Sequence, residues 1–376
     1  MQYSSPGLGD RERTVIAEIE DLRGKLRHVL HEPSRWVGSL RRLSFARNLQ
    51  NSNDIEGYRS SLDDAAAIVI GEDPRDLDQA ARSALEGYRD AMTYVIQRVE
   101  DEDFSCSVDF IKGLHFMMTN QAIRNRPGRW RAGAVYVTDS RSGEVVHTGA
   151  DVDEVPVLME ELVDYVNTTE DDLLVKAALV HLNLAMIHPF RDGNGRMARC
   201  LQSFVLAAGG LRSPIFMSIE EYLGEHTRDY YQVLSQVGRG SWQPSPETRP
   251  WIRFNLTAHL RQAKTLRRRT KDFERLWMDM RLAVGSREER QLAALSDAAT
   301  GLTIRRATYL KIAHEVGEEI SDQTAGRDLK ALTDEGLLEA RGEKRGRYYV
   351  ATEAVAGVWL AIRKDRDPTE AADPFA

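Results

Sequence analysis

The sequence predicts a mainly α-helical protein with more than one domain, and three observations support this. Apolar residues recur every three to four positions in most segments, which places them on one side of an α-helix. Short β-prone runs occur near residues 135–147 and 337–350. A turn-rich stretch at residues 238–250 and a break at Gly285-Ser286 divide the chain. Its 376 residues are enough for two or three domains of roughly 150 residues each.

Composition and charge exclude several classes of protein. Hydrophobic residues make up 42% and charged residues 29%, a globular mixture. The net charge of -7 argues against a chain that coats nucleic acid, although a local basic patch is compatible with it. Two cysteines are too few for a disulfide scaffold or a Cys-rich zinc site. The polar amino end resembles no secretory signal, and no apolar run reaches the ~20 residues of a membrane span. We therefore expect a cytoplasmic protein without a membrane partner.

The first half of the chain is expected to form a series of amphipathic helices. In residues 13–29, Val15, Ile19 and Leu22 recur at helical spacing. Similar patterns occupy residues 34–49, 61–70, 78–99, 108–118, 155–166 and 173–187. Residues 135–137 and 144–147 are β-prone and enclose a polar stretch, which predicts a hairpin with a mobile tip.

The second half predicts a long helix and then a smaller unit. After the turn-rich stretch, helices are expected at residues 288–295, 307–316 and 321–335, the last with Ser321 as its N-cap. Two short strands around a glycine-containing turn follow at residues 337–350. Three helices and a hairpin in this order resemble a winged helix-turn-helix. The expected division is an amino-terminal helical region, a central core, a linker helix, the winged helix and a tail, at residues 1–107, 108–262, 263–286, 287–352 and 353–376.

One segment carries most of the chemical information: it reads His188-Pro-Phe-Arg-Asp-Gly-Asn-Gly-Arg-Met-Ala-Arg199. Pro189 cannot continue the preceding helix, so that helix is expected to end here. The Gly193-Asn-Gly195 turn then opens a new helix near Arg196. Backbone N–H groups at a helix start point outward, and the helix dipole adds partial positive charge. The backbone alone therefore predicts an anion site.

The side chains of this segment fit the same interpretation. Arg196 and Arg199 are three residues apart and share one face of the new helix. Asp192 is a hard oxygen ligand suited to a Mg²⁺ that bridges phosphates, and His188 can accept a proton near neutral pH. A single histidine or a single Gly-Asn-Gly turn is most often structural. Their occurrence with Asp192 and two arginines within 12 residues favours a phosphate-handling site.

This segment resembles the signature of the Fic (filamentation induced by cAMP) family, His-x-Phe-x-Asp-Gly-Asn-Gly-Arg-x-x-Arg, at every defined position. The similarity covers roughly residues 100–262, including the hairpin before the motif and residues 217–234 after it. The resemblance implies a helical core with a β-hairpin flap. It also implies transfer of AMP from ATP to a Ser, Thr or Tyr hydroxyl of a target protein, with release of pyrophosphate.

Residue roles follow from the same resemblance. His188 would be the general base, Phe190 would anchor the loop, and Asp192 would hold Mg²⁺ on the phosphates. The nucleotide-binding set implied by the family is Arg191, Asp192, Gly193, Asn194, Gly195, Arg196, Arg199, Tyr230 and Tyr231. Within this set, Arg199 would reach the γ-phosphate and the two tyrosines would line the nucleoside pocket. The hairpin residues that resemble the target-aligning flap are Val145, Val146, His147 and Thr148.

Two positions refine the resemblance. Phosphotransferase members of the family carry Lys where this chain has Gly195, so glycine here favours nucleotidyl over phosphoryl transfer. Gly238 stands where relatives often carry Asn, so the resemblance does not supply the usual contact to adenine there.

A second motif lies upstream: Ser52-Asn-Asp-Ile-Glu-Gly57 resembles the inhibitory motif of the family. In relatives this glutamate, here Glu56, pairs with the second motif arginine, here Arg199, and takes the place of the γ-phosphate. The resemblance implies the subclass with an amino-terminal inhibitory helix. In some relatives the same glutamate assists AMP removal, so de-AMPylation is a further activity to consider. The alternative to an inhibitory role is that Glu56 is an ordinary solvated glutamate.

A DNA-binding transcriptional regulator that uses the Fic domain as a nucleotide sensor is the alternative function. Residues 287–352 carry 11 Lys and Arg against 12 Asp and Glu, which is poor for a DNA reader. The expected wing is richer in cations: Arg341, Lys344, Arg345 and Arg347. DNA contact, protein docking and self-association remain alternatives for this segment. The sequence also leaves open the modified target, the nucleotide donor and the oligomeric state, a homodimer included.

Overall fold

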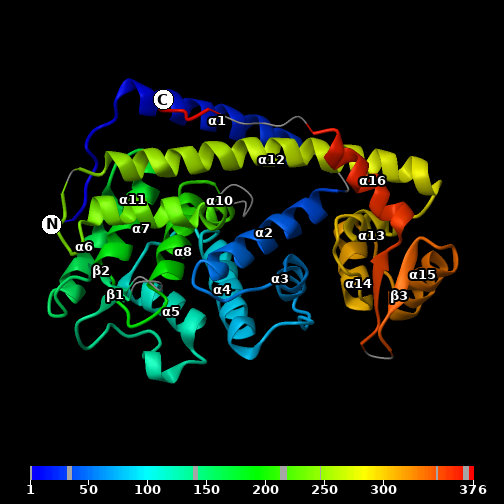
Figure 1. Ribbon diagram of the computed structural model, residues 1–376, viewed down its shortest axis with the longest axis horizontal. Coiled ribbons are helices and arrows are strands. Elements are labelled where there is room, and N and C mark those ends of the chain that lie inside the picture. Colours follow the sequence, from blue (N-terminus) through cyan, green and yellow to red (C-terminus); the bar gives the residue numbers. More distant parts are fainter. Residues whose placement is uncertain are drawn as a thin grey trace.

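The computed structural model describes residues 2–31, 36–138, 143–211, 218–245, 247–343, 346–366 and 372–376. Within these ranges the chain forms a larger helical body and a smaller carboxy-terminal unit, and one long helix runs along both (Figure 1). The mainly helical fold class predicted from the sequence is confirmed.

The larger body consists of helices and one hairpin. Its elements are α1 (Asp10–His31), α2 (Val37–Asp54), α3 (Leu62–Val69), α4 (Gln79–Arg98), α5 (Val108–Thr119), the 3₁₀ turn η1 (Ile123–Asn125), β1 (Tyr136–Thr138), β2 (Val145–Thr148), α6 (Val155–Thr168), α7 (Leu173–Ile187), α8 (Asn194–Ala208), α10 (Glu220–Glu225), α11 (Thr227–Gly238) and α12 (Arg249–Val284). Strands β1 and β2 pair antiparallel, with Tyr136 opposite Thr148. The tip expected between them, residues 139–142, lies outside the described ranges, as do Ser34 and Met217.

Helices α7 and α8 occupy the centre of this body. Twelve residues of α7 are buried, on all sides of the helix. A helix that is apolar all round has to be surrounded by protein. Thirteen residues of α8 are buried as well. The short loop between the two helices, residues 188–193, is therefore fixed at both ends by the core.

Helix α12 runs the length of the molecule (Figure 1). Trp251 and Leu266 are buried in the core of the larger body, while Leu276 and Met280 belong to the core of the smaller unit. Residues 263–286 are thus not a separate linker helix. Their apolar stripe continues that of the preceding turns, and the helix ends only where Gly285 takes a φ of 73°, a left-handed value that favours glycine.

The carboxy-terminal unit contains α13 (Glu289–Ala299), α14 (Arg306–Glu315), α15 (Asp322–Asp334), β3 (Leu338–Arg341), β4 (Tyr348–Ala351) and α16 (Glu353–Lys364). Ser321 caps α15, because its Oγ accepts a hydrogen bond from the N–H of Thr324 at 3.2 Å. Strands β3 and β4 are antiparallel. Lys344 and Arg345 of the expected wing lie outside the described residues.

Part of the tail expected at residues 353–376 forms a helix. Residues 353–364 form α16, which buries Val355 and Ile362 in the core of the carboxy-terminal unit. The last residues, 372–376, return to α1, where Arg11 donates a hydrogen bond to the carbonyl of Phe375 at 3.0 Å. Phe375 is 9% exposed. Burial of these apolar side chains stabilises both described parts of this segment, residues 353–364 and 372–376.

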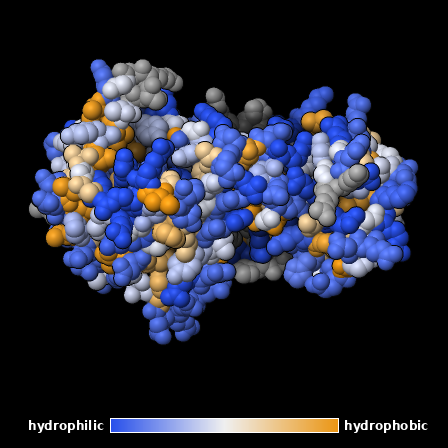
Figure 2. Space-filling view, turned by 90° about the horizontal axis from the view of Figure 1, so that it is seen from below, coloured by the Kyte–Doolittle hydropathy of each residue, from blue (hydrophilic) through white to orange (hydrophobic). Residues whose placement is uncertain are grey.

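The surface agrees with the composition. The face shown in Figure 2 is mostly hydrophilic, with hydrophobic residues in small separate patches. Within the described ranges, no helix combines the length and the apolar character needed to cross a membrane.

Candidate active site

The loop between α7 and α8 is held in one conformation by its own side chains. His188 caps α7 in the left-handed region, with φ of 54°, and its N–H donates to the carbonyl of Leu184 at 3.0 Å. The amide of Asn194 bonds both the N–H and the carbonyl of Phe190 at 2.9 Å. Gly193, with φ of 78°, precedes α8. A non-glycine residue held at positive φ costs free energy, and such residues concentrate at functional sites.

The His188 side chain is arranged as a proton acceptor. Its Nδ1 lies 3.2 Å from the carbonyl oxygen of Ala185. Because a carbonyl can only accept, Nδ1 carries the proton and Nε2 keeps its lone pair. Burial, the largest influence, lowers the pKa of His188 to about 4, although the bond to Ala185 and the charge of Glu56 act in the opposite direction. His188 is therefore neutral at pH 7 and can accept a proton at Nε2.

Arg131 fixes the backbone of the same loop, and no feature of the sequence pointed to it. Its Nε donates to the carbonyl of His188 at 2.8 Å, and its Nη1 donates to the carbonyl of Gly133 at 2.8 Å. Nη2 donates to the carbonyl of Ala150, at the end of the hairpin. One guanidinium thus ties the position of His188 to the hairpin.

The start of α8 forms an anion cradle. No side chain caps this helix, and its first-turn amides have no intrahelical partners. Arg196 and Arg199 are each only 2% exposed. Among the described residues, Nε and Nη1 of Arg196 and Nη1 of Arg199 are buried donors without a hydrogen-bond partner. Leaving buried charged donors unpaired is costly, so these atoms fit the oxygens of a bound phosphate chain.

Glu56 occupies part of this cradle. It lies in the turn after α2, and its Oε1 accepts a hydrogen bond from Nη2 of Arg199 at 2.7 Å. Ser52 holds the same guanidinium, because its Oγ and its carbonyl accept from Nε and Nη2, both at 2.8 Å. Burial disfavours the charge of Arg199, but Glu56 outweighs it and raises the pKa of Arg199. The structure therefore brings the upstream motif into contact with the second motif arginine.

Gly195 makes room for this contact. A Cβ on this residue would lie 2.2 Å from Oε1 of Glu56 and 3.2 Å from Nη1 of Arg199. No real Cβ tolerates the first distance, so any side chain at Gly195 would have to displace the Glu56 carboxylate.

Asp192 lies beside the cradle, and each of its carboxylate oxygens accepts a hydrogen bond. Its Oδ1 accepts from the N–H of Gly193 at 2.7 Å, and its Oδ2 accepts from Nδ2 of Asn125 at 2.7 Å. Each carboxylate oxygen has a second lone pair, so a metal ligand role is still open to it. No cluster of three or more His, Cys, Asp or Glu side chains suited to a metal occurs in the part of the chain that the structure describes. A single carboxylate fits Mg²⁺ that takes its other ligands from phosphates and water.

His115 and Asn125 support this loop from outside the motif, and the sequence analysis missed both. The His115 ring stacks on Phe190 with centroids 3.7 Å apart and an angle of 4°. Its Nε2 donates to the carbonyl of Asp192 at 3.0 Å, and its Nδ1 accepts from the N–H of Gly128. The histidine thus joins the loop to the segment after η1. Neither residue can be recognised from the sequence, because both lie far from the motif along the chain and belong to no pattern of their own.

The three aromatic residues near the cradle differ in exposure. Tyr231 is 46% exposed, and its hydroxyl donates to the carbonyl of Ile55 at 3.4 Å. Tyr230 is only 1% exposed and its hydroxyl lies 2.9 Å from Nε2 of His181, so it faces the core. Tyr58, which the sequence analysis missed, has its ring 5.1 Å from the guanidinium of Arg196, close enough for a cation–π contact.

The hairpin offers a short free edge. Val145 and Val146 of β2 are 55% and 38% exposed. His147 is buried, and its Nε2 donates to the carbonyl of Met186 at 2.9 Å, which ties β2 to α7. At Thr148 the outer edge is already paired, because its N–H donates to the carbonyl of Gly240 at 2.9 Å. Only the first part of β2 is therefore available to pair with another strand.

The motif, the helix α8 that follows it and the hairpin lie in a segment that is similar to known proteins. Residues 105–206 match the Fic/DOC family. This Fic segment (residues 105–206) contains α5, the hairpin, α7 and most of α8. A crystal structure of a Fic family protein from Desulfovibrio desulfuricans has a TM-score of 0.57 at 22% identity, and the match covers 93% of this chain and 99% of that one. A structure of Fic-1 from Caenorhabditis elegans has a TM-score of 0.55 at 22% identity over 69% of this chain and 73% of that one. At these identities the likeness shows the fold.

Curated relatives extend the similarity beyond the Fic segment. Protein adenylyltransferase Fic of Nematostella vectensis is 28% identical over 270 residues, 67% of this chain and 56% of that protein. Protein adenylyltransferase fic-1 of Caenorhabditis elegans is 25% identical over 262 residues, 67% of this chain and 46% of that protein. The chain thus spans about half the length of these two relatives.

Proposed function

We propose that the protein is an adenylyltransferase that moves AMP from ATP to a hydroxyl side chain of a target protein and releases pyrophosphate. The observation that carries this proposal is the juxtaposition at the start of α8. Unpartnered buried donors of Arg196 and Arg199 lie next to a neutral His188 whose Nε2 is free to accept a proton. The names of the relatives support the same reaction.

Each step of the proposed reaction is assigned to one of these groups. The target hydroxyl oxygen attacks the α-phosphorus while its proton passes to Nε2 of His188. The bond between the α-phosphorus and the bridging oxygen breaks, and its electron pair leaves with pyrophosphate. The amides of α8, Arg196 and Arg199 offset the negative charge of the phosphates, and a fixed, partly buried set of donors does so without reorganising. His188 starts neutral, so it can take this proton at pH 7.

Asp192 is the residue that would hold Mg²⁺. The ion would supply positive charge on the phosphate oxygens when bound. Asn125 and the Gly193 amide hold the Asp192 carboxylate in a fixed orientation. His115 fixes its backbone.

The described conformation corresponds to an inhibited state. Glu56 holds Arg199 in an ion pair at 2.7 Å and lies where any Cβ on Gly195 would be. A carboxylate there repels the phosphates that the cradle is built to bind, and it uses the arginine that would neutralise them. ATP can bind productively only after Glu56 moves.

The surroundings of the site favour a target segment that is acidic next to the modified hydroxyl. Arg124, Arg126 and Arg129 are exposed, and they form a local group of three cations although the chain as a whole carries -7. They border the site because Asn125 bonds Asp192 and Nη1 of Arg191 donates to the carbonyl of Arg124 at 3.1 Å. Exposed cations at the rim of a site attract an oppositely charged partner and raise its rate of association.

No observation on the described residues specifically favours the alternative function, a DNA-binding regulator. Of the four expected wing cations, Lys344 and Arg345 lie outside the described residues, and Arg341 pairs with Glu339 at 2.9 Å. Arg305, at the start of α14, contacts Glu72 of the same chain. Adenylyl transfer is therefore the function we propose.

Labelled ATP tests the proposal directly. Glu56→Gly protein is incubated with a cell lysate and ATP labelled either at the α-phosphate or at the γ-phosphate. We expect protein-bound label only from the α-labelled nucleotide, and acidic residues next to the modified hydroxyl in the labelled peptides. Label from the γ-position would instead show phosphoryl transfer. The same experiment with the Glu56→Gly, His188→Ala double variant controls for labelling by lysate enzymes.

Replacing Asp192 by alanine is expected to lower the transfer rate and its dependence on Mg²⁺ together. The reason is that the metal would lose its protein ligand and the pyrophosphate charge would be less neutralised. The measurement is the rate as a function of Mg²⁺ concentration in the Glu56→Gly background. Asn125→Ala serves as a comparison, since it frees Oδ2 of Asp192 without removing the carboxylate. An undiminished rate with unchanged Mg²⁺ dependence in Asp192→Ala would show that Asp192 is structural.

A further inference from the structure

The inhibitory motif and the carboxy-terminal unit are connected through one helix. Ser52 lies in the last turn of α2, and Arg42 lies ten residues earlier in the same helix, roughly 15 Å away along its axis. In Figure 1, α2 runs from the carboxy-terminal unit to the neighbourhood of α8. We propose that the carboxy-terminal unit holds α2 in the position that keeps Glu56 on Arg199, and that its release from α2 and α3 activates the site. The proposal rests on the proposed function for its activity readout.

The first attachment is a buried ion-pair network on α2. Arg42 is 5% exposed, and its two terminal nitrogens donate to Asp297 of α13 and to Glu315 of α14. These two carboxylates outweigh the effect of burial and raise the pKa of Arg42. Gly38 permits this approach, since a Cβ there would lie 2.7 Å from Oε2 of Glu315. Buried charges require their partners at fixed positions, so this network fixes α2 relative to α13 and α14.

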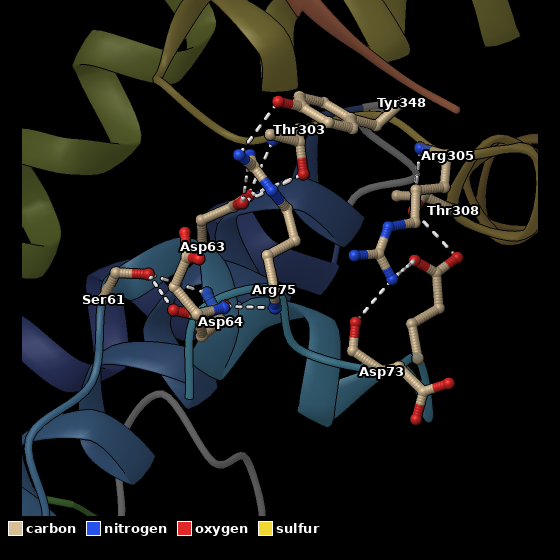
Figure 3. Close-up of polar contacts among 11 residues, drawn as sticks. Ser61, Asp63, Asp64, Asp73, Arg75, Thr303, Arg305, Thr308 and Tyr348 are labelled. Atoms are coloured by element: carbon tan, nitrogen blue, oxygen red, sulfur yellow. Dashed lines mark hydrogen bonds and ion pairs between the residues drawn. The ribbon is translucent and has the colours of Figure 1, made fainter. Parts of the chain in front are cut away.

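The second attachment joins α3 to the loop before α14, as Figure 3 shows. Asp63 accepts hydrogen bonds from the N–H of Thr303 at 2.7 Å and from its hydroxyl at 3.0 Å. The preceding Leu302 is 5% exposed and belongs to the core of the larger body. The carboxy-terminal unit therefore inserts one apolar side chain and two donors beside α3.

The third attachment involves the loop between α3 and α4, also drawn in Figure 3. Nη2 of Arg75 donates to the hydroxyl of Tyr348 at 2.9 Å, and its guanidinium lies 3.9 Å from the centre of that ring. Glu72 accepts from the hydroxyl of Thr308 at 3.0 Å. Since α2 and α3 pack on each other within the same core, all three attachments act on the helix that ends at the inhibitory motif.

This junction is built so that it can open. The two sides have largely separate hydrophobic cores, with Leu302 as an exception, and the attachments between them are mostly hydrogen bonds and ion pairs, which water can replace. A groove of about 1070 Å³ enters the junction, and its lining includes Glu72 and Asp73 on one side and Arg305, Lys330 and Tyr349 on the other. On its other side the unit is fastened to the end of α12 through Leu276 and Met280. It can therefore turn about α12 while leaving α2 and α3.

The test weakens the junction without burying an unpaired charge. The double variant Asp63→Ala, Glu315→Ala removes two half-buried carboxylates, 23% and 24% exposed, and leaves Arg42 paired with Asp297. The matched control is Glu319→Ala, Glu335→Ala, which makes the same change of charge within the carboxy-terminal unit. There the two carboxylates pair with His314 and Arg287 and not with a residue of α2 or α3.

Two readouts are compared between these proteins. Hydrogen exchange at the end of α2 reports its position directly, for example at Ile55, whose N–H donates to the carbonyl of Asn51. We expect protection there to fall by roughly tenfold in the junction variant only, equivalent to about 1.4 kcal/mol. Auto-modification should rise by a similar factor. The junction changes should give no further rise when they are added to Glu56→Gly, because both changes release the same arginine.

The outcomes separate the two proposals. Unchanged exchange and unchanged auto-modification in the junction variant would overturn the proposed role of the carboxy-terminal unit. A further outcome is that the junction variant loses protection while neither it nor Glu56→Gly transfers AMP. That result would support the role of the carboxy-terminal unit in holding α2 and would reject the proposed function. Equal effects of the junction variant and its control would show a general response to charge, which also contradicts the proposal.

Discussion

Replacing Glu56 by glycine is expected to raise auto-modification by about 10- to 100-fold. In the structure the Glu56 carboxylate holds Arg199 at 2.7 Å and faces the first turn of α8. A hydrogen bond to a charged group contributes about 1.5–3 kcal/mol, and each 1.4 kcal/mol is a factor of ten. Without the carboxylate, Arg199 is free for the γ-phosphate, and ATP no longer competes with a fixed negative charge. The measurement is incorporation of α-labelled AMP into the protein itself.

Arg199 provides the control for this prediction. Arg199→Ala also breaks the ion pair, but it removes the phosphate partner along with it, so it should not activate. The double variant should behave like Arg199→Ala, a strongly non-additive result of the kind expected for residues in contact. Glu335→Ala, which changes the same charge far from the site, should match wild type. Activation of Arg199→Ala to the level of Glu56→Gly would contradict the proposed role of this pair.

A second explanation of the same rise needs its own measurement. If Glu56 assists removal of AMP by activating water, Glu56→Gly would raise net modification by blocking the reverse reaction. Following the loss of label from pre-modified protein, with wild type and variant compared, separates the two. If Glu56→Gly alters neither direction, the ion pair between Glu56 and Arg199 has no regulatory role.

Replacing His188 by alanine is expected to lower AMP transfer by at least ~10²-fold, the usual contribution of a general base. The bond to the carbonyl of Ala185 orients the His188 ring so that Nε2 is free, and Arg131 fixes the backbone of His188. The rate should be measured in the Glu56→Gly background. Binding of ATP should persist, because the donors of Arg196 and Arg199 are unchanged. Near-normal transfer by a folded His188→Ala protein would reject the assignment.

The pH profile adds an independent check on His188. Burial lowers its pKa to about 4, so the base is deprotonated above that value and charged below it. Transfer by Glu56→Gly protein should therefore be nearly constant from neutral pH down to about pH 5 and fall below that. His314→Ala, an exposed histidine of the carboxy-terminal unit, should leave the profile unchanged. An acid limb centred near the ordinary histidine value would contradict the burial effect.

The sequence by itself determined the helical class and the chemical identity of the candidate site. Helical periodicity is a local property, and so the expected helices lie within a few residues of α1, α4, α5, α7 and α15. The loop after α7 could be placed from residue types alone, because Pro189 ends a helix and Gly193 permits the turn that starts the next. These effects act over a few residues and need no tertiary contact.

Only the tertiary structure decided which distant residues surround that loop. Arg131, His115 and Asn125 reach it from 57 to 77 positions away, through hydrogen bonds that no spacing in the sequence reveals. The contact between Glu56 and Arg199 spans 143 positions and was expected only from the family resemblance, whereas the contact between Arg42 and Asp297, 255 positions apart, was not expected at all. The packing of residues 372–376 near α1 likewise depends on burial of Phe375, which no local pattern predicts. Packing between elements sets all of these contacts, and a local pattern carries no information about the partner against which an element will pack.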